Sequence, residues 1–212
     1  MKRNALIVFL LFALTAGCAG VPVREAFKVD TSLPLGKIEG NQFVGIRYPF
    51  NVSAPPNWQV TTKYPDFMLD FGYDKEGLET SQVFVFNPTT RSNLQIDLEA
   101  ADRYTKFSQE SMEALVTSVT GIFEDEMKNQ YGKEVKAEIG PTEKVYLKGV
   151  PYAARKYGIY THEGEKWEQG WIYGFSEPYQ IFILYMINES KGSNDRADLK
   201  TILDSFEYIQ KK

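Results

Sequence analysis

The chain has 212 residues, of which 43% are hydrophobic and 25% are charged, and its formal net charge at pH 7 is −4. This mildly acidic balance argues against nucleic acid or anionic lipid as the main partner. The length is sufficient for one domain with a sizeable core.

The N-terminus has the plan of a secretory signal peptide. Lys2 and Arg3 precede an apolar run over residues 5–14, and small residues follow at 15–17. The run is too short to cross a bilayer, which takes about 20 apolar residues. We therefore expect residues 1–17 to direct export and to be removed. The mature chain would carry 22 basic and 28 acidic residues.

Cys18 is the only cysteine of the chain and follows these small residues directly. The sequence LTAGC resembles the lipobox of bacterial lipoproteins, with Thr15 where that family most often has Leu. The resemblance implies cleavage before Cys18 and acylation of its sulfur and new amino group, so that the membrane itself is a partner. Ala19, in place of Asp, implies an outer-membrane address if the host has two membranes. The alternative is a chance cysteine beside an ordinary cleavage site.

Residues 18–41 are predicted to form a lipid-anchored tether. Proline at 22 and 34 and glycine at 36 and 40 interrupt the segment, and neither helical nor strand periodicity persists in it. A flexible chain of about 20 residues has an end-to-end distance of roughly 25 Å. Such a tether would lift the domain off the lipid headgroups.

The domain, residues 42–212, begins with strand patterns. We expect strands in the segments 42–55, which Pro49 interrupts, 57–64, 66–73 and 82–87. The run 92–100 alternates, with Leu94, Ile96 and Leu98 on one face and polar side chains on the other.

The period then changes to that of a helix. Ser108 is the expected N-cap and Gly132 the expected stop. The apolar positions between them recur every three or four residues and form one face: Met112, Leu115, Val116, Val119, Ile122, Phe123 and Met127.

Strand patterns return at 135–140, 143–149, 152–162, 166–175 and 179–188. A second helix over 194–209 closes the chain, with a buried stripe of Leu199, Ile202, Leu203 and Phe206. Most connections are too short for crossovers. We therefore predict an α+β fold, a largely antiparallel twisted sheet packed by a central helix and a C-terminal helix.

Several short pieces between 42 and 208 resemble the PsbP-like superfamily. They are Tyr48-Pro49, the PNW sequence at 56–58, a strand–turn–strand piece at 144–160 and Ser205-Phe206. The resemblance implies an α/β/α sandwich and a role in binding or scaffolding, usually without chemistry. It supplies no active-site motif.

The sequence offers little for catalysis. The sole histidine, His162, stands in a predicted hairpin turn with Glu163 and Glu165. Zinc sites use several His or Cys ligands, so we expect neither a metal nor a cofactor, and a serine triad has no second histidine to draw on. Paired carboxylates remain as an alternative, an envelope hydrolase, but the EDE run at 124–126 is interpreted as a solvated helix face.

Aromatic residues make up 14% of the chain and are densest over 157–175. Trp167, Trp171 and Tyr173 share one face of a predicted strand, and Tyr160 belongs to the preceding one. A sheet covered on both faces would bury them all; otherwise some of them line an open groove and bind a partner.

The sequence thus predicts a non-catalytic lipoprotein that binds or scaffolds in the cell envelope. The expected partner is an envelope protein, an envelope polymer or a small amphiphile. A chaperone that shelters apolar helices is a further hypothesis.

Overall fold

The computed structural model describes residues 23–72, 83–192 and 194–210, so the predicted signal peptide and Cys18 lie outside the described residues. The strands are β1 (Gly36–Glu39), β2 (Gln42–Gly45), β3 (Phe50–Ser53), β4 (Gln59–Thr61), β5 (Val83–Phe86), β6 (Asn93–Ala100), β7 (Glu138–Ile139), β8 (Glu143–Lys144), β9 (Tyr152–His162), β10 (Glu165–Ser176), β11 (Tyr179–Asn188) and β12 (Glu207–Tyr208). The helices are the 3-10 helix η1 (Asp66–Phe71) and the α-helices α2 (Gln109–Ser118), α3 (Thr120–Tyr131) and α4 (Asp195–Ser205).

A large antiparallel sheet forms the middle layer. Its order is β4-β5-β6-β11-β10-β9-β7, and β8 also pairs with β9. The predicted hairpin between β9 and β10 is confirmed, because His162 pairs with Glu165 across the two turn residues Glu163 and Gly164. Both turn residues have positive φ angles, 51° and 79°, as a type I′ turn requires.

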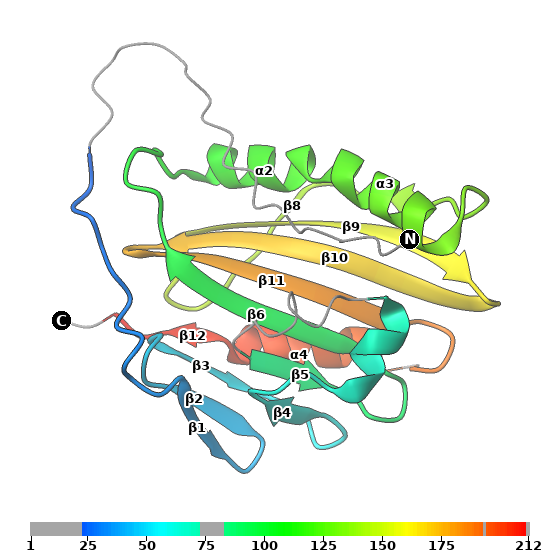
Figure 1. Ribbon diagram of the computed structural model, residues 1–212, viewed down its shortest axis with the longest axis horizontal. Helices are drawn as coiled ribbons and strands as arrows, with labels where there is room; N and C mark the ends of the chain where they lie inside the picture. Colours follow the sequence, from blue (N-terminus) through cyan, green and yellow to red (C-terminus); the bar gives the residue numbers. More distant parts are fainter. Residues whose placement is uncertain (1–22, 73–82, 193, 211–212) are drawn as a thin grey trace, which may run out of the picture.

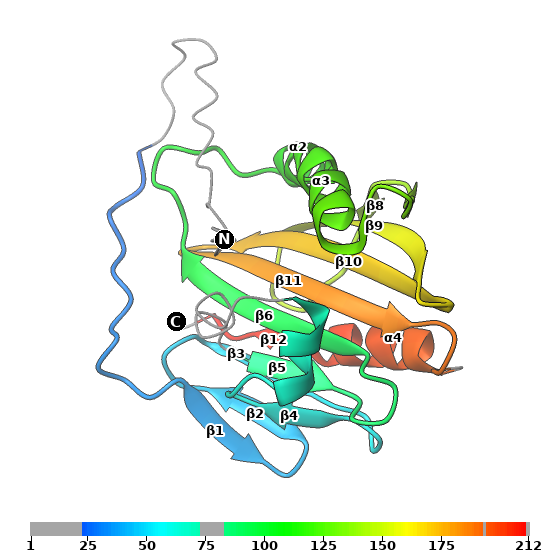
Figure 2. The ribbon, with the colours of Figure 1, turned by 45° about the vertical axis from the view of Figure 1, so that its right-hand side comes forward.

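Helices α2 and α3 cover one face of this sheet, and α4 with the small sheet β1-β2-β3-β12 covers the other (Figures 1 and 2). The core on the α4 side includes all four residues of the predicted stripe, Leu199, Ile202, Leu203 and Phe206. The predicted α+β fold, a mostly antiparallel sheet between a central helical element and a C-terminal helix, is therefore confirmed. The second helix is shorter than the predicted 194–209, because α4 ends at Ser205 and Glu207–Tyr208 form β12.

The central helix is divided in two at Val119. The indole Nε1 of Trp171 donates a hydrogen bond of 2.7 Å to the carbonyl oxygen of Val116. In an uninterrupted helix that oxygen would accept from the amide of Thr120, and a side chain inserted at such a point is a known cause of helix bending.

Residues 66–71 form η1, so the prediction of a strand there is wrong. Pro65 precedes the helix, and Gly72 closes it with a φ of 75°. Met68 is fully buried and packs against Phe84 of the large sheet. Phe67 also packs against Phe86, and Phe71 packs against Trp167, so the helical turn brings three side chains of this short segment against the sheet.

The predicted tether boundary also needs correction. Within the predicted tether 18–41, Gly36–Glu39 form β1 and pair with β2. Val29 packs against the core. The folded unit therefore begins well before residue 42.

Candidate functional site

Three of the four aromatic residues predicted to bind a partner are core residues. Trp171, Trp167 and Tyr160 are 1%, 6% and 3% exposed. They pack with buried residues of α2 and α3 such as Val116 and Phe123. The prediction that they line an open groove is wrong, and the alternative, burial beneath a covering layer, is correct for these three. Helix α2 lies over β9 and β10, and the α3 rings of Phe123 and Tyr131 lie against Trp171 and Tyr160.

Tyr173, the fourth predicted residue, is only half-buried. It lies on the helix-covered face of the sheet beside Phe182, with 4.9 Å between the ring centroids. Phe182 in turn pairs with Asp97 of β6. Tyr173 thus lies at the border between the part of this face that α2 and α3 cover and the part that they leave uncovered.

We call the next part of this face the sheet strip. Alternate residues of a strand share a face, so the strand register places its members together. They are Tyr173 of β10, Phe182 and Leu184 of β11, and Asp97 and Glu99 of β6. The first four are half-buried and Glu99 is exposed. In Figure 2, β11 and β6 lie to one side of α2 and α3, while η1 stands at their far end.

The carboxylates and the phenol of the sheet strip influence one another. Although the Glu99 residue is exposed as a whole, desolvation by the surrounding residues raises the pKa of its carboxyl, and the neighbouring charge of Asp97 raises it further. Burial, with a smaller effect from Glu99, raises the pKa of Tyr173 to about 12. Tyr173 is therefore a neutral phenol at physiological pH, able to donate or accept a hydrogen bond.

The sheet strip combines an apolar floor with negative charge. Phe182 and Leu184 offer hydrocarbon surface, and Asp97 and Glu99 add negative charge. A molecule with both an apolar and a cationic part meets complementary groups here. Among the residues that the structure describes, no three His, Cys, Asp or Glu side chains are grouped as a metal ion would need.

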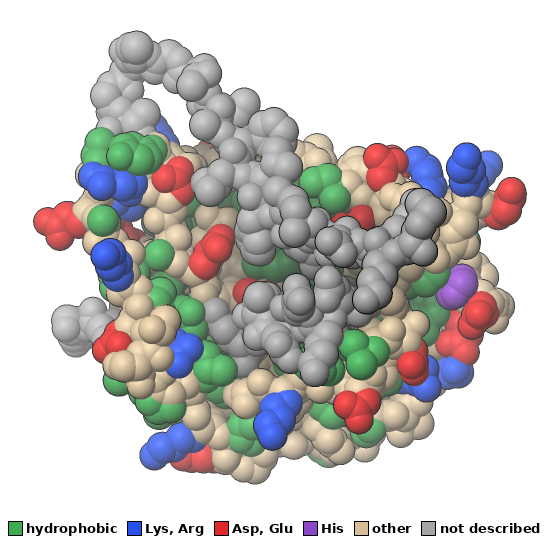
Figure 3. All heavy atoms as spheres, in the orientation of Figure 1, with side chains coloured by type: hydrophobic (Ala, Val, Ile, Leu, Met, Phe, Trp, Pro, Cys, Tyr) green, Lys and Arg blue, Asp and Glu red, His purple; other side chains and the backbone are tan. Residues whose placement is uncertain are grey.

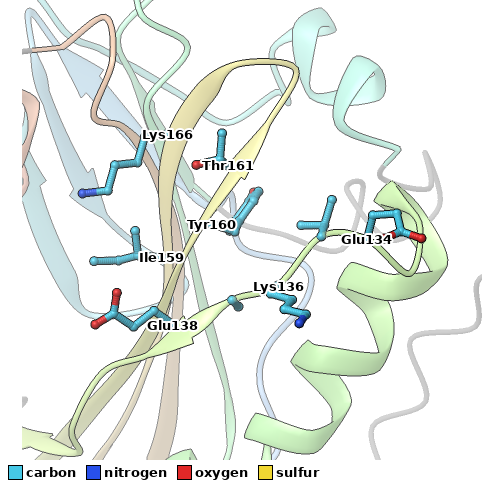
Figure 4. A pocket seen from close by; sticks show the side chains of 9 residues that line it. Glu134, Lys136, Glu138, Ile159, Tyr160, Thr161 and Lys166 are labelled. Carbon is cyan, nitrogen blue, oxygen red and sulfur yellow. The ribbon is translucent and has the colours of Figure 1, made fainter.

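A separate hollow of about 640 Å³ lies where β7 ends against β9. Figure 4 shows Tyr160 and Thr161 on the β9 side and Glu134 and Lys136 on the other. Glu138 and Lys166 complete a balanced set of two acids and two bases. The hollow is wide open and its charges offset one another, so it favours no particular ligand charge.

A second group of carboxylates lies on the opposite face of the sheet. Glu168 is 3% exposed and accepts a hydrogen bond of 2.8 Å from the Tyr185 hydroxyl. Arg196 of α4 forms ion pairs with both Glu168 and Glu189. Burial, together with the charge of Glu168, raises the pKa of Tyr185 well above its ordinary value. These carboxylates are occupied by their partners and act as a link between α4 and the sheet.

The remaining predicted positions lie at the surface. Of the EDE run, Asp125 and Glu126 are exposed, as expected of a solvated helix face, and Glu124 is half-buried. His162 is half-buried with its ring against Tyr131, 4.3 Å between centroids. Its Nε2 lies 3.9 Å from a carboxylate oxygen of Glu163.

The sheet strip was not predicted from the sequence. The run 179–188 is apolar at nearly every position, which predicts cover on both faces. The signal present in the sequence is strand alternation, which places Asp97 and Glu99 on the same face of β6 as the polar positions Asn93 and Gln95. Asn93 and Gln95 are buried. The two acids lie further along that face, where Asp97 is half-buried and Glu99 is exposed.

No helix of the described residues is long and apolar enough to cross a membrane. No family model matches the chain, and neither does any curated protein. Among solved structures, the chain is similar to cyanobacterial PsbP (CyanoP) from Synechocystis sp. PCC 6803, with a TM-score of 0.54 and 12% identity over 83% of this chain and 99% of that one. This likeness confirms the PsbP-like fold.

Two further solved structures are more distant. A protein of Bacteroides thetaiotaomicron gives a TM-score of 0.45 with 11% identity, over 82% of this chain and 50% of that one. LpqN of Mycobacterium tuberculosis, described as involved in cell envelope biogenesis, gives 0.44 with 11% identity over 74% and 82% of the two chains.

Proposed function

We propose that this protein is a lipid-anchored, non-catalytic binding module of a bacterial cell envelope. The observation that carries the binding role is the sheet strip, where half-buried Phe182 and Leu184 adjoin the carboxylates of Asp97 and Glu99. Its ligand is a cationic amphiphile, or a protein segment with neighbouring apolar and basic side chains.

The anchor rests on the sequence of the leader. Acylated Cys18 holds the mature protein to the membrane, because each buried CH₂ contributes about 0.8 kcal/mol and two chains together bind firmly. Ala19 supports an outer-membrane position on the periplasmic side in a host with two membranes. Substitution Cys18→Ser is expected to move the protein from the membrane fraction to the soluble fraction, and unchanged fractionation would refute the anchor.

Binding at the sheet strip is tested with dodecylammonium below its micelle concentration, with dodecyl sulfate as the probe of opposite charge. The soluble Cys18→Ser chain is titrated by calorimetry. We expect dodecylammonium to bind and dodecyl sulfate not to bind. Phe182→Ser and Glu99→Gln should each weaken the binding, the first by removing apolar surface and the second by removing charge.

Ile122→Ser is the matched control, because Ile122 is a 53% exposed apolar residue on α3. It should leave the affinity unchanged. Equal affinity in the wild type, Phe182→Ser and Glu99→Gln would exclude the sheet strip as the binding site.

The alternative function, an envelope hydrolase with paired carboxylates, is favoured by one observation. The raised pKa of Glu99 beside Asp97 is a property of general acids. Turnover of a wall glycan by the purified protein, lost in Glu99→Gln, would replace the binding proposal with this one.

A further inference from the structure

The first described residues are fastened to one end of the domain. The backbone amide of Arg24 donates to the carbonyl of Arg103 at 3.0 Å. Its guanidinium donates to the carbonyls of Asp102, at 3.3 Å, and of Thr105. The guanidinium also lies over two aromatic rings, 4.8 Å from the centroid of Phe107 and 5.0 Å from that of Phe175.

The same segment is held again further along. The Phe27 ring meets Tyr179 edge-on, with 5.1 Å between centroids. Arg47 donates to the carbonyl oxygens of Thr31, at 2.9 Å, and of Leu33, at 2.8 Å. Residues 23–35 therefore run along one edge of the domain, the left edge in Figure 1, up to β1.

Fastening this segment leaves very little chain for a tether. Only four residues separate Cys18 from Val23, and the five Cα-to-Cα steps between them reach about 17 Å at most. An acylated Cys18 is thus confined near the end of the domain where Arg24 is bound. A tether running to residue 41 would have allowed the domain to rotate freely.

That end carries exposed aromatic and apolar side chains. Tyr104, Val23 and Phe27 are 61%, 57% and 40% exposed. The Arg103 guanidinium lies 5.1 Å from the centroid of the Tyr104 ring, and Lys106 is exposed two residues later. At the upper left of Figure 3, where the described chain begins, hydrophobic side chains adjoin Lys or Arg. Tyrosine is enriched at the membrane–water interface, and the long side chains of lysine and arginine are also favoured there.

Acidic residues also lie at this end, and they limit how strongly it could be attracted to a negatively charged surface. Glu25 and Glu177 are exposed, and Glu177 lies 4.0 Å from Arg24. The charge is therefore mixed, so the attraction comes from the aromatic and apolar side chains and from the acyl anchor. The contact does not depend on anionic lipid.

We propose that the end formed by residues 23–28 and the loop 101–107 lies against the bilayer that holds acylated Cys18, with Tyr104 among the lipid headgroups. This inference rests on the proposed lipid anchor. The β9–β10 turn then points away from the membrane, since it stands at the other end of strands 11 and 12 residues long (Figure 1). At about 3.3 Å per residue, the turn is more than about 30 Å from the bilayer.

The acylated full chain, reconstituted in vesicles of phosphatidylethanolamine and phosphatidylglycerol, tests the orientation. Because acylation consumes Cys18, Tyr104→Cys and Glu163→Cys each supply a single free thiol for a nitroxide label. Both residues are exposed, so neither label disturbs the core. We expect the label at 104 to collide several-fold less often with a water-soluble nickel chelate than the label at 163 does.

Arg24→Ala serves as the second variant, since it removes the contacts that fasten the segment. In this background the label at 104 should recover the chelate access of the label at 163. Equal access at the two sites of vesicle-bound protein with Arg24 intact would overturn the orientation and leave the anchor standing. Failure of the acylated chain to sediment with vesicles would overturn both.

Discussion

Gly170 of β10 is the position where the smallest chemical change should have a large effect on stability. A Cβ added there would overlap the ring and hydroxyl of Tyr185, which crosses β10 at this point. Tyr185 is fully buried and donates its hydroxyl to Glu168. Gly170→Ala therefore forces a buried ring to move and breaks a hydrogen bond to a buried carboxylate.

The expected cost of Gly170→Ala combines two effects. Overpacking a core costs about 1–3 kcal/mol, and a hydrogen bond to a charged group contributes about 1.5–3 kcal/mol. We expect the free energy of unfolding to fall by about 3 kcal/mol or more, a large part of the 5–15 kcal/mol that is typical of a domain.

Urea unfolding of the soluble Cys18→Ser chain, followed by tryptophan fluorescence, measures this cost. Gly121→Ala in α3 is the matched control, because a Cβ there meets nothing within 4 Å. That substitution should stabilise the protein by about 0.5–1 kcal/mol through helix propensity. With Tyr185→Ala already present, Gly170→Ala should cost far less than it does alone. A Gly170→Ala variant as stable as the wild type would refute the packing described for β10.

Three further predictions follow from the contacts described above. Ser108→Ala should lower the free energy of unfolding in urea by about 1 kcal/mol, because the Ser108 hydroxyl accepts a hydrogen bond of 3.2 Å from the Ser111 amide. The control, Ser118→Ala at the other end of α2, should change that free energy by no more than about 0.5 kcal/mol. Equal effects of the two substitutions would contradict the role of Ser108 as a cap. Because the fold raises the pKa of Glu99, the ionised carboxylate destabilises the folded protein at pH values above the folded-state pKa. This penalty disappears as the pH falls toward 4.5, the pKa of the unfolded chain. Glu99→Gln should therefore raise the free energy of unfolding at pH 7 and leave it unchanged below about pH 4; the opposite order would show that the Glu99 carboxylate is stabilised in the fold. Arg24→Ala should make Lys28 more accessible to trypsin and raise the rate of cleavage there. A cleavage rate equal to that of the wild type would show that Arg24 does not hold residues 23–35.

The features predicted correctly from the sequence are those with local causes. Ser108 caps α2 through a bond to a residue three positions on. The turn at Glu163 and Gly164 is defined by its own backbone angles. Leu199, Ile202 and Leu203 follow helical spacing, whereas Phe206 lies past the end of α4 in extended backbone.

The features missed depend on contacts between distant parts of the chain. Arg24 meets carbonyls 78 and 81 residues away, so the segment around it has the local composition of a tether. Trp171 shares a strand face with Tyr173, as predicted, yet only the position of α2 determines that Trp171 is buried and Tyr173 half-buried. Strand alternation shows which side chains share a face, but it carries no information about how far a covering helix extends.

The state of Cys18 is the most direct test of the anchored location on which the orientation depends. Intact-mass analysis of the mature protein from bacterial membranes should show a chain that begins at Cys18 and carries the mass of two or three acyl chains. A mature chain with an unmodified Cys18 thiol would contradict the account.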